Sequence, residues 1–142
     1  MNIRQMELED LPQLAILYRQ FWNEDSNIDQ MKAQFRKINQ RKTHILLSAV
    51  SEDRLVGSVM GVVCDELYGD CLPFLVIENM IVDRGARRMG VGKALLNELE
   101  KRARERQCSQ MILVTERNRT DACGFYESYG FLKDHKGYKK KL

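Results

Sequence analysis

One stretch in the middle of the chain constrains the fold more than any other. It begins with a run of apolar and β-branched residues, 74–82, which only Glu78 and Asn79 interrupt. A run this apolar predicts a strand buried on both faces, as in the middle of a sheet. A short polar turn and a pair of glycines, Gly90 and Gly92, follow it. The stretch therefore starts as a buried strand that leads into a glycine-rich loop.

After the glycines the apolar period changes to that of a helix. The residues that recur at this spacing are Val91, Ala94, Leu95, Leu99 and Ala103. The first turn of a helix has backbone N–H groups without partners and the positive end of the helix dipole. Glycines there let a ligand approach the backbone, and Arg87, Arg88 and Lys93 add positive charge. The unit predicts a site for an anion such as a phosphate or pyrophosphate.

Two familiar phosphate-binding loops fit this segment poorly. A Walker loop requires a hydroxyl residue directly after Gly92-Lys93, but Ala94 follows, and its first glycine would fall at Arg87. A dinucleotide-binding loop, G-x-G-x-x-G, matches Gly90 and Gly92 but has Leu95 at its third position. A third kind of loop fits better.

Three segments together resemble the GNAT superfamily of N-acetyltransferases. Residues 87–92, RRMGVG, match its R/Q-x-x-G-x-G/A loop, and residues 77–83, IENMIVD, are similar to the strand that precedes this loop. Residues 125–131, FYESYGF, are similar to the later F-Y-E-x-x-G-F segment of the family. The resemblance covers most of the chain from Leu55 to the end, in the order and spacing of the family.

The resemblance implies that the chain binds acetyl-CoA. The pyrophosphate would lie on the loop and first helical turn, and the pantetheine arm would pair with the backbone of the preceding strand. Of that strand, the Met80 amide is the expected donor to the oxyanion. The arm would also contact Asn118, or Arg119 or Thr120 beside it. The cofactor-binding residues that the resemblance predicts are Met80, Ile81, Val82, Arg87, Arg88, Met89, Gly90, Val91, Gly92, Lys93 and Asn118.

Two side chains are predicted to catalyse the transfer. Glu78 is an acid within an apolar strand, where a carboxylate is costly unless it is paired or lies in a wet cleft. The resemblance gives a glutamate at this place the task of orienting or deprotonating the amine, directly or through water. Tyr126 is the expected general acid, because a phenol of pKa about 10 can protonate a thiolate of pKa about 8.5 held against it.

Composition limits the other classes of function. The 142 residues suit a single domain, 1–142, and a net charge of +3 is too small to indicate a nucleic-acid partner. The apolar runs are too short to span a membrane, and the N-terminus lacks the apolar region of an export signal, so we expect a cytoplasmic protein. Two isolated histidines and four cysteines without a C-x-x-C pair predict no metal site.

The predicted order of elements is mixed α/β. Asp10 is the expected cap of a first helix, whose apolar stripe is Leu11, Leu14, Leu17, Tyr18 and Phe21. Ser26 or Asn27 is the expected cap of a second helix, and Asp121 of a short helix over residues 122–129. Gly57 and Gly61 mark a bulge or a close packing contact within a strand. The predicted strands are residues 2–6, 44–50, 55–63, 74–82, 110–115, 131–132 and 137–142. This is the GNAT-type fold, with a mostly antiparallel sheet of six or seven strands, one parallel β-α-β crossover and about four helices.

The resemblance implies direct acetyl transfer from acetyl-CoA to a primary amine, with no metal. We expect a small-molecule acceptor such as an aminoglycoside, polyamine or aminophosphonate, bound by acids and aromatic residues of the first two helices and of the connection before the central strand. The alternatives are a protein amine as acceptor, or an acyl-CoA-binding module without turnover. The resemblance leaves a homodimer open. The residues expected at the acceptor site are Glu24, Asp25, Asp29, Asp65, Glu66, Asp70, Trp22 and Tyr68.

Overall fold

The computed structural model describes residues 1–142 as two compact units, Met1–Ile112 and Leu113–Leu142. The first unit contains one sheet in the order β1-β2-β3-β4-β5, antiparallel except for the parallel pair β4 and β5. Its strands are β1 (Asn2–Gln5), β2 (His44–Ser51), β3 (Arg54–Cys64), β4 (Phe74–Val82) and β5 (Met111–Ile112). Its helices are α1 (Leu11–Trp22), α2 (Ile28–Asn39) and α3 (Val91–Glu105), with short 3-10 turns at Leu8–Asp10 and Arg84–Ala86.

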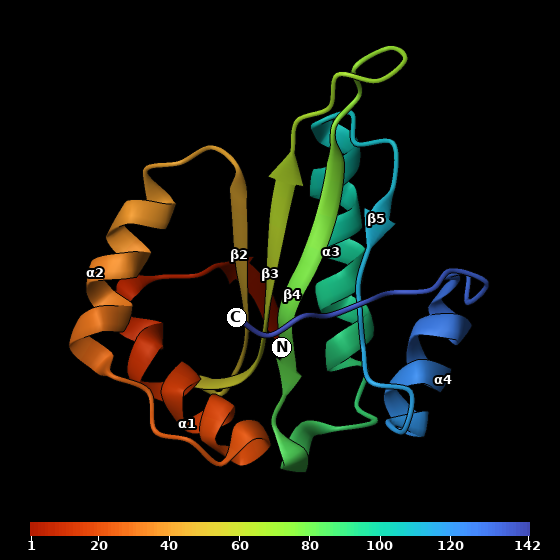
Figure 1. Cartoon of the computed structure of the whole chain (residues 1–142). Coiled ribbons are helices and arrows are strands. Elements are labelled where there is room, and N and C mark those ends of the chain that lie inside the picture. Colours follow the sequence, from red (N-terminus) through yellow and green to blue (C-terminus); the bar gives the residue numbers. More distant parts are fainter. The chain divides into compact units, whose positions relative to one another are not determined.

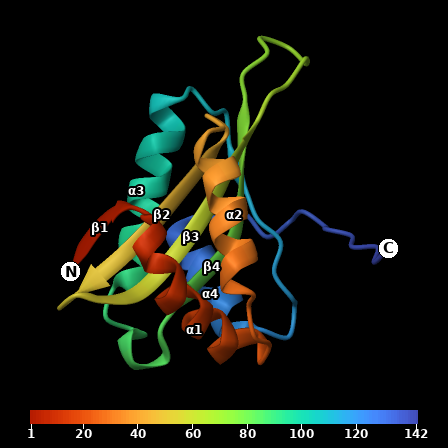
Figure 2. The same cartoon turned by 90° about the vertical axis from the view of Figure 1, so that its left-hand side faces the viewer.

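The two faces of the sheet are covered by different helices. Figure 1 shows α3 on one face and α1 with α2 on the other, and Figure 2 looks onto the face that α1 and α2 cover. The α1 stripe predicted from the sequence packs inward, with Leu11, Leu14 and Leu17 buried. Asn27 caps α2 as expected, its side chain accepting a hydrogen bond from the Gln30 amide at 3.0 Å. None of the helices combines the length and the apolar character needed to cross a membrane.

Asp10 does not cap α1 as the sequence predicted. Its buried carboxylate instead accepts hydrogen bonds from the Arg4 guanidinium at 2.7 and 2.8 Å, from Ser48 at 2.8 Å and from the Glu7 amide at 2.9 Å. Burial alone would raise the pKa of Asp10, but these hydrogen bonds and the Arg4 charge hold that pKa below its ordinary value. This cluster ties β1 and β2 to the start of α1.

Helix α3 packs directly on two glycines of β3. A Cβ atom at Gly57 would lie 2.9 Å from Val91 Cγ1, and one at Gly61 would lie 2.7 Å from Leu99 Cδ1. Both distances are shorter than side chains tolerate, so the helix can approach the sheet this closely only because these positions lack a side chain. Both predicted roles are present: the glycines allow close packing, and the strand register shifts beside Gly57, where Ala49 pairs with Gly57 and Val50 with Leu55.

Strand β4 has buried side chains on both faces, as the sequence predicted. Leu75 and Ile77 are buried on the α3 side, whereas Ile81 is buried on the opposite side, in the cluster that contains Leu11 and Leu14 of α1. Ser58 pairs with Ile81 while Met60 pairs with Glu78, so two β4 residues lie opposite a single β3 residue. This is a β-bulge, and it includes Asn79 in the left-handed region at φ +50°. The bulge leaves Glu78 and Asn79 exposed.

The second unit contains α4 (Thr120–Tyr129), which Gly130 ends in the left-handed conformation. The helix begins two residues earlier than predicted, and Asp121 lies in its first turn rather than at its cap. Residues 131–132 and 137–142 form no strands, and the strand predicted over 110–115 is reduced to β5, so the sheet has five strands instead of six or seven. The lysine-rich end of the chain offers no alternating apolar face for a strand to bury.

We expect Gly61→Ala to lower the free energy of unfolding by about 2 kcal/mol, because the added methyl group overlaps the fully buried Leu99 and Leu75 side chains. Urea denaturation measures this. Arg54→Ala, at an exposed position of the same strand, is the control and should change stability by less than about 0.5 kcal/mol. Equal stability of Gly61→Ala and the wild type would contradict the close packing of α3.

We expect the contribution of Asp10 to stability to depend on pH. Because its folded pKa is lowered, the ionised carboxylate stabilises the fold above the ordinary carboxyl pKa of about 3.9, and this contribution is lost as the pH falls below that value through the folded pKa. Asp10→Asn should cost about 2 kcal/mol at neutral pH and much less near pH 3. Urea denaturation at both pH values tests this, and a cost independent of pH would contradict it.

Candidate active site

The loop between β4 and α3 is held by hydrogen bonds to its own backbone and to α1. The Asp83 side chain accepts a hydrogen bond from the Gly85 amide at 3.0 Å. Gln20 of α1 donates from Nε2 to Asp83 Oδ1 at 2.7 Å, and its Oε1 accepts from the Arg84 amide at 3.2 Å. Ala86 is buried below the loop. The conformation of the loop is therefore fixed on the side that faces α1.

The N-terminus of α3 offers unpartnered amide groups. Gly90 precedes the helix with φ +82°, and no side chain caps it. The first backbone hydrogen bond of the helix runs from the Ala94 amide to the Gly90 carbonyl at 3.0 Å, so the amides of Val91, Gly92 and Lys93 have no protein partner. The helix dipole adds a partial positive charge at the same point. An anion is the group that satisfies such amides.

Positive side chains surround these amides. Arg87, Arg88 and Lys93 are exposed, and none of them forms an ion pair in the structure. Met89 is exposed as well, whereas Val91 is buried against the sheet and can contribute only its backbone. The loop residues predicted from the sequence thus lie together, and their charges and amides can hold a phosphate or pyrophosphate.

The outer edge of β4 is free over most of its length. Strand β5 pairs with β4 only at Leu75 and Val76, and the remaining residues of β4 have a strand neighbour on the β3 side alone. Figure 1 shows β5 as a short arrow beside the longer β4. The free edge includes Met80, Ile81 and Val82, which the sequence predicted to bind a cofactor. Its backbone groups can pair with an extended ligand that contains amides.

Glu78 lies at the bulge of β4, in register with Met60 of β3. Its side chain is exposed and forms no ion pair, which fits a carboxylate in a wet cleft and not a paired one, the two settings expected from the sequence. A carboxylate without a basic partner can accept a proton or a hydrogen bond from a bound amine. The position of Glu78 therefore suits the role predicted for it.

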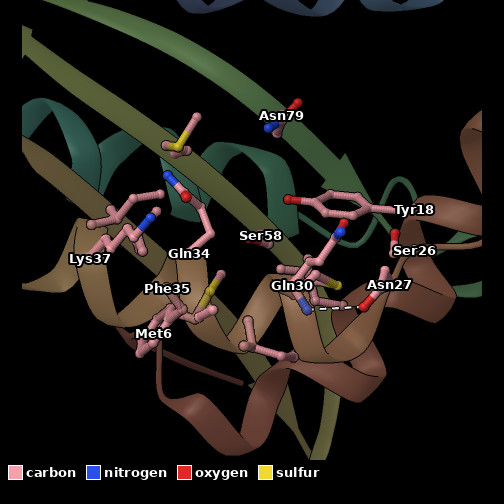
Figure 3. A pocket seen from close by; sticks show the side chains of 17 residues that line it. Met6, Tyr18, Ser26, Asn27, Gln30, Gln34, Phe35, Lys37, Ser58 and Asn79 are labelled. Carbon is pink, nitrogen blue, oxygen red and sulfur yellow. Dashed lines mark hydrogen bonds between the residues drawn. The ribbon is translucent and has the colours of Figure 1, made fainter.

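A pocket of about 720 Å³ lies beside the bulge, between α1, α2 and the sheet. Figure 3 shows Asn79 of β4 directed into it, with Tyr18 of α1 beside it and Gln30, Gln34 and Lys37 of α2 along the other side. Burial raises the pKa of Tyr18 to about 12, so its phenol stays protonated at neutral pH. A pocket of this size suits a small molecule.

The pocket residues differ from those that sequence reasoning selected. The expected acids and aromatic residues of the first two helices and the following connection do not line it: Glu24, Asp25, Asp29, Asp65, Glu66, Asp70, Trp22 and Tyr68. Its charged and amide residues come instead from the inner face of α2, where Gln30, Gln34 and Lys37 follow at helical spacing. That spacing was a signal available in the sequence, whereas the turn of Asn79 into the pocket depends on the bulge.

The comparison with known proteins identifies the family. The model of the acetyltransferase (GNAT) family matches residues 11–131. The chain belongs to the GNAT acetyltransferase family.

Relatives of this GNAT protein are distant in sequence. It is 26% identical to the uncharacterized protein YdhI of Bacillus subtilis (strain 168) over 84 residues, 59% of this chain and 48% of that protein. The chain therefore spans about half the length of the curated relative it matches. The structure of a transcriptional regulator from Bacillus halodurans C-125 has a TM-score of 0.91 and 26% identity over 99% of both chains.

A further solved structure shows the likeness of fold alone. Glucosamine-6-phosphate N-acetyltransferase from Arabidopsis thaliana is 18% identical, with a TM-score of 0.87 over 99% of this chain and 97% of that chain. The fold of the GNAT protein and the family predicted from its sequence are thus confirmed.

The residues present fit acetyl-CoA, which the GNAT family uses. The amides of Val91, Gly92 and Lys93 lack partners, as a pyrophosphate site requires, and the free β4 edge can accept the amides of a pantetheine arm. Both features belong to the first unit and lie at the two ends of one loop. The fit rests on backbone groups and on a few positive side chains.

Two predicted site residues of the GNAT protein lie in the second unit. Tyr126 is in α4, where its ring lies 5.2 Å from that of Phe125 and 5.8 Å from that of Phe131. Burial raises its pKa above the ordinary phenol value, although the Arg119 charge acts in the opposite direction. Asn118 lies in the turn before this helix. The second unit is described by itself, so the roles of Tyr126 and Asn118 stay predictions.

We expect Lys93→Ala to weaken the binding of inorganic pyrophosphate roughly fivefold, because one charge beside the free amides is lost. Isothermal titration calorimetry measures the affinity. Lys101→Ala, on the same helix two turns away, is the matched control and should bind as the wild type does. An equal effect of both substitutions would show that the site is not at the N-terminus of α3.

Proposed function

We propose that this GNAT protein is an acetyl-CoA-dependent N-acetyltransferase that acts on a primary amine of a small molecule. The observation that carries the proposal is the anion site at the start of α3, joined by one short loop to a strand whose outer edge is free. Acetyl-CoA combines an anion and an extended arm with amides, and it supplies an activated acetyl group as a thioester.

The backbone of β4 positions the acetyl group in this proposal. The amides of Val91, Gly92 and Lys93 bind the pyrophosphate, and the free edge of β4 binds the arm. With acetyl-CoA bound, the Met80 amide beside the bulge would donate a hydrogen bond to the carbonyl oxygen of the thioester. A fixed donor at the point where negative charge develops lowers the barrier to attack.

Glu78 prepares the amine in this proposal. An alkylammonium group has a pKa of about 10, so it must lose a proton before it can attack. Glu78 is exposed beside Asn79 and has no ion-pair partner, so it can take this proton directly or through a water molecule. The bond from nitrogen to the acetyl carbon then forms as the bond from carbon to sulfur breaks.

Tyr126 completes the proton balance in this proposal. The leaving thiolate needs a proton, and the phenol of Tyr126 donates it. Because burial raises the pKa of Tyr126, the phenol is protonated throughout the neutral range and below pH 10.

The pocket supports a small acceptor rather than a protein. The volume of the pocket, about 720 Å³, is in the range of small-molecule sites. The pocket reaches the bulge of β4, because Asn79 of the bulge is one of its lining residues. An acceptor in this pocket would present its amine at the strand that holds the thioester. A protein acceptor would have to insert a side chain between α1 and α2.

We expect Tyr126→Phe to lower kcat about a hundredfold, because the leaving thiolate loses its proton donor. CoA affinity should not change, since the phenol takes no part in holding the pyrophosphate. The measurement is thiol release from acetyl-CoA with a panel of primary amines, with Tyr138→Phe in the chain terminus as the matched control. Full activity of Tyr126→Phe would remove this residue from the mechanism but leave the enzyme assignment intact.

Ligand-induced thermal stabilisation separates the enzyme from a binding module. CoA at about a hundred times its dissociation constant should add about 2.7 kcal/mol to the stability and raise the midpoint by roughly 5 °C or more. NAD should not do so. A shift with CoA and no thiol release with any amine would favour an acyl-CoA-binding module, and no shift with CoA would contradict the proposed function itself.

A further inference from the structure

The pocket beside the bulge contains no acidic side chain. Among its 17 lining residues the one charged side chain is Lys37, and the others are apolar or neutral. Acids are what a polyamine or an aminoglycoside would need for its several ammonium groups. The lining therefore argues against the polycationic acceptors that the sequence suggested.

Most of the pocket wall is apolar and buried. Leu11 and Leu14 come from α1, Phe35 from α2 and Leu46 from β2, and each of these side chains is less than a tenth exposed. A ligand gains free energy here by removing apolar surface from water. A second ammonium group placed against this wall would lose its hydration without gaining a partner.

Besides Tyr18, Ser26, Asn27 and Ser58, the pocket has polar side chains on its β4 side and along α2. Asn79 marks the β4 side, and Glu78, which does not line the pocket, is its neighbour in the bulge. Gln30, Gln34 and Lys37 follow one face of α2, and Lys37 lies about 10 Å along the helix from Gln30. Lys37 forms no ion pair in the structure. The pocket thus has an unpaired positive charge on α2, and the acid Glu78 adjoins its lining on the β4 side.

We propose that the acceptor is a primary amine on an apolar body that ends in a carboxylate, with the amine at the β4 bulge and the carboxylate at Lys37. This inference rests on the proposed function, because it names the substrate class of the same site. The acetylated nitrogen passes its proton to Glu78 as before. Lys37 is then a specificity-determining residue that selects the anionic end of the acceptor.

Three amines with one aromatic body test the charge preference. They are para-(aminomethyl)benzoate, para-(aminomethyl)benzamide and para-xylylenediamine, which carry an anionic, a neutral and a cationic end. We expect kcat/KM to fall in that order. The step from benzoate to benzamide should be roughly three- to fivefold, the size of a solvent-exposed ion pair, and should shrink at high salt.

Substitutions on α2 assign the preference to Lys37. Lys37→Gln should abolish the difference between benzoate and benzamide, and Lys37→Glu should favour the diamine over the benzoate. Lys32→Gln is the matched control, because Lys32 is on the same helix but does not line the pocket. It should keep the order of the wild type.

The outcomes separate this inference from the proposed function. Thermal stabilisation by CoA is measured first, and its absence contradicts the function rather than the acceptor class. With CoA binding present, equal turnover of the three amines, a preference for the diamine, or an unchanged order in Lys37→Gln overturns the inference alone. If none of the three is acetylated and none stabilises the CoA-bound protein further, the inference is also overturned.

Discussion

Helix α3 lies so close to the sheet that two positions beneath it have no room for a side chain. Gly57 and Gly61 occupy these two positions, and the buried Val91 and Leu99 side chains of the helix pack against them. The close contact fixes where the helix begins relative to the end of β4. The free amides of its first turn are therefore held at a constant distance from the strand edge, as binding of an extended ligand with an anionic group requires.

Strand β4 contributes to the core on both faces and to the site at its bulge. Leu75 and Ile77 pack under α3 and Ile81 packs with α1, while the bulge exposes Glu78 and turns Asn79 toward the pocket. The bulge interrupts the pairing with β3, and the early end of β5 frees the opposite edge. One irregular strand thus borders the anion site, the proposed position of the thioester and the acceptor pocket.

Local patterns in the sequence predicted much of this arrangement. The helical period after Gly90 predicted α3, the loop charges predicted an anion site, and the α1 stripe predicted the buried face of that helix. The bulge at Asn79 was missed, because a strand interrupted by a bulge and an even strand have the same apolar composition. The missing C-terminal strands and the absence of acids from the pocket lining also depend on tertiary contacts that no local period reports.

Amide hydrogen exchange with and without CoA tests the central claim most directly. The account predicts that CoA slows exchange in two separate segments, the amides of Gly90–Ala94 at the start of α3 and those of Met80–Val82 on the edge of β4, and leaves the far end of α3 unchanged. Slower exchange elsewhere, with no change in either of these segments, would contradict it.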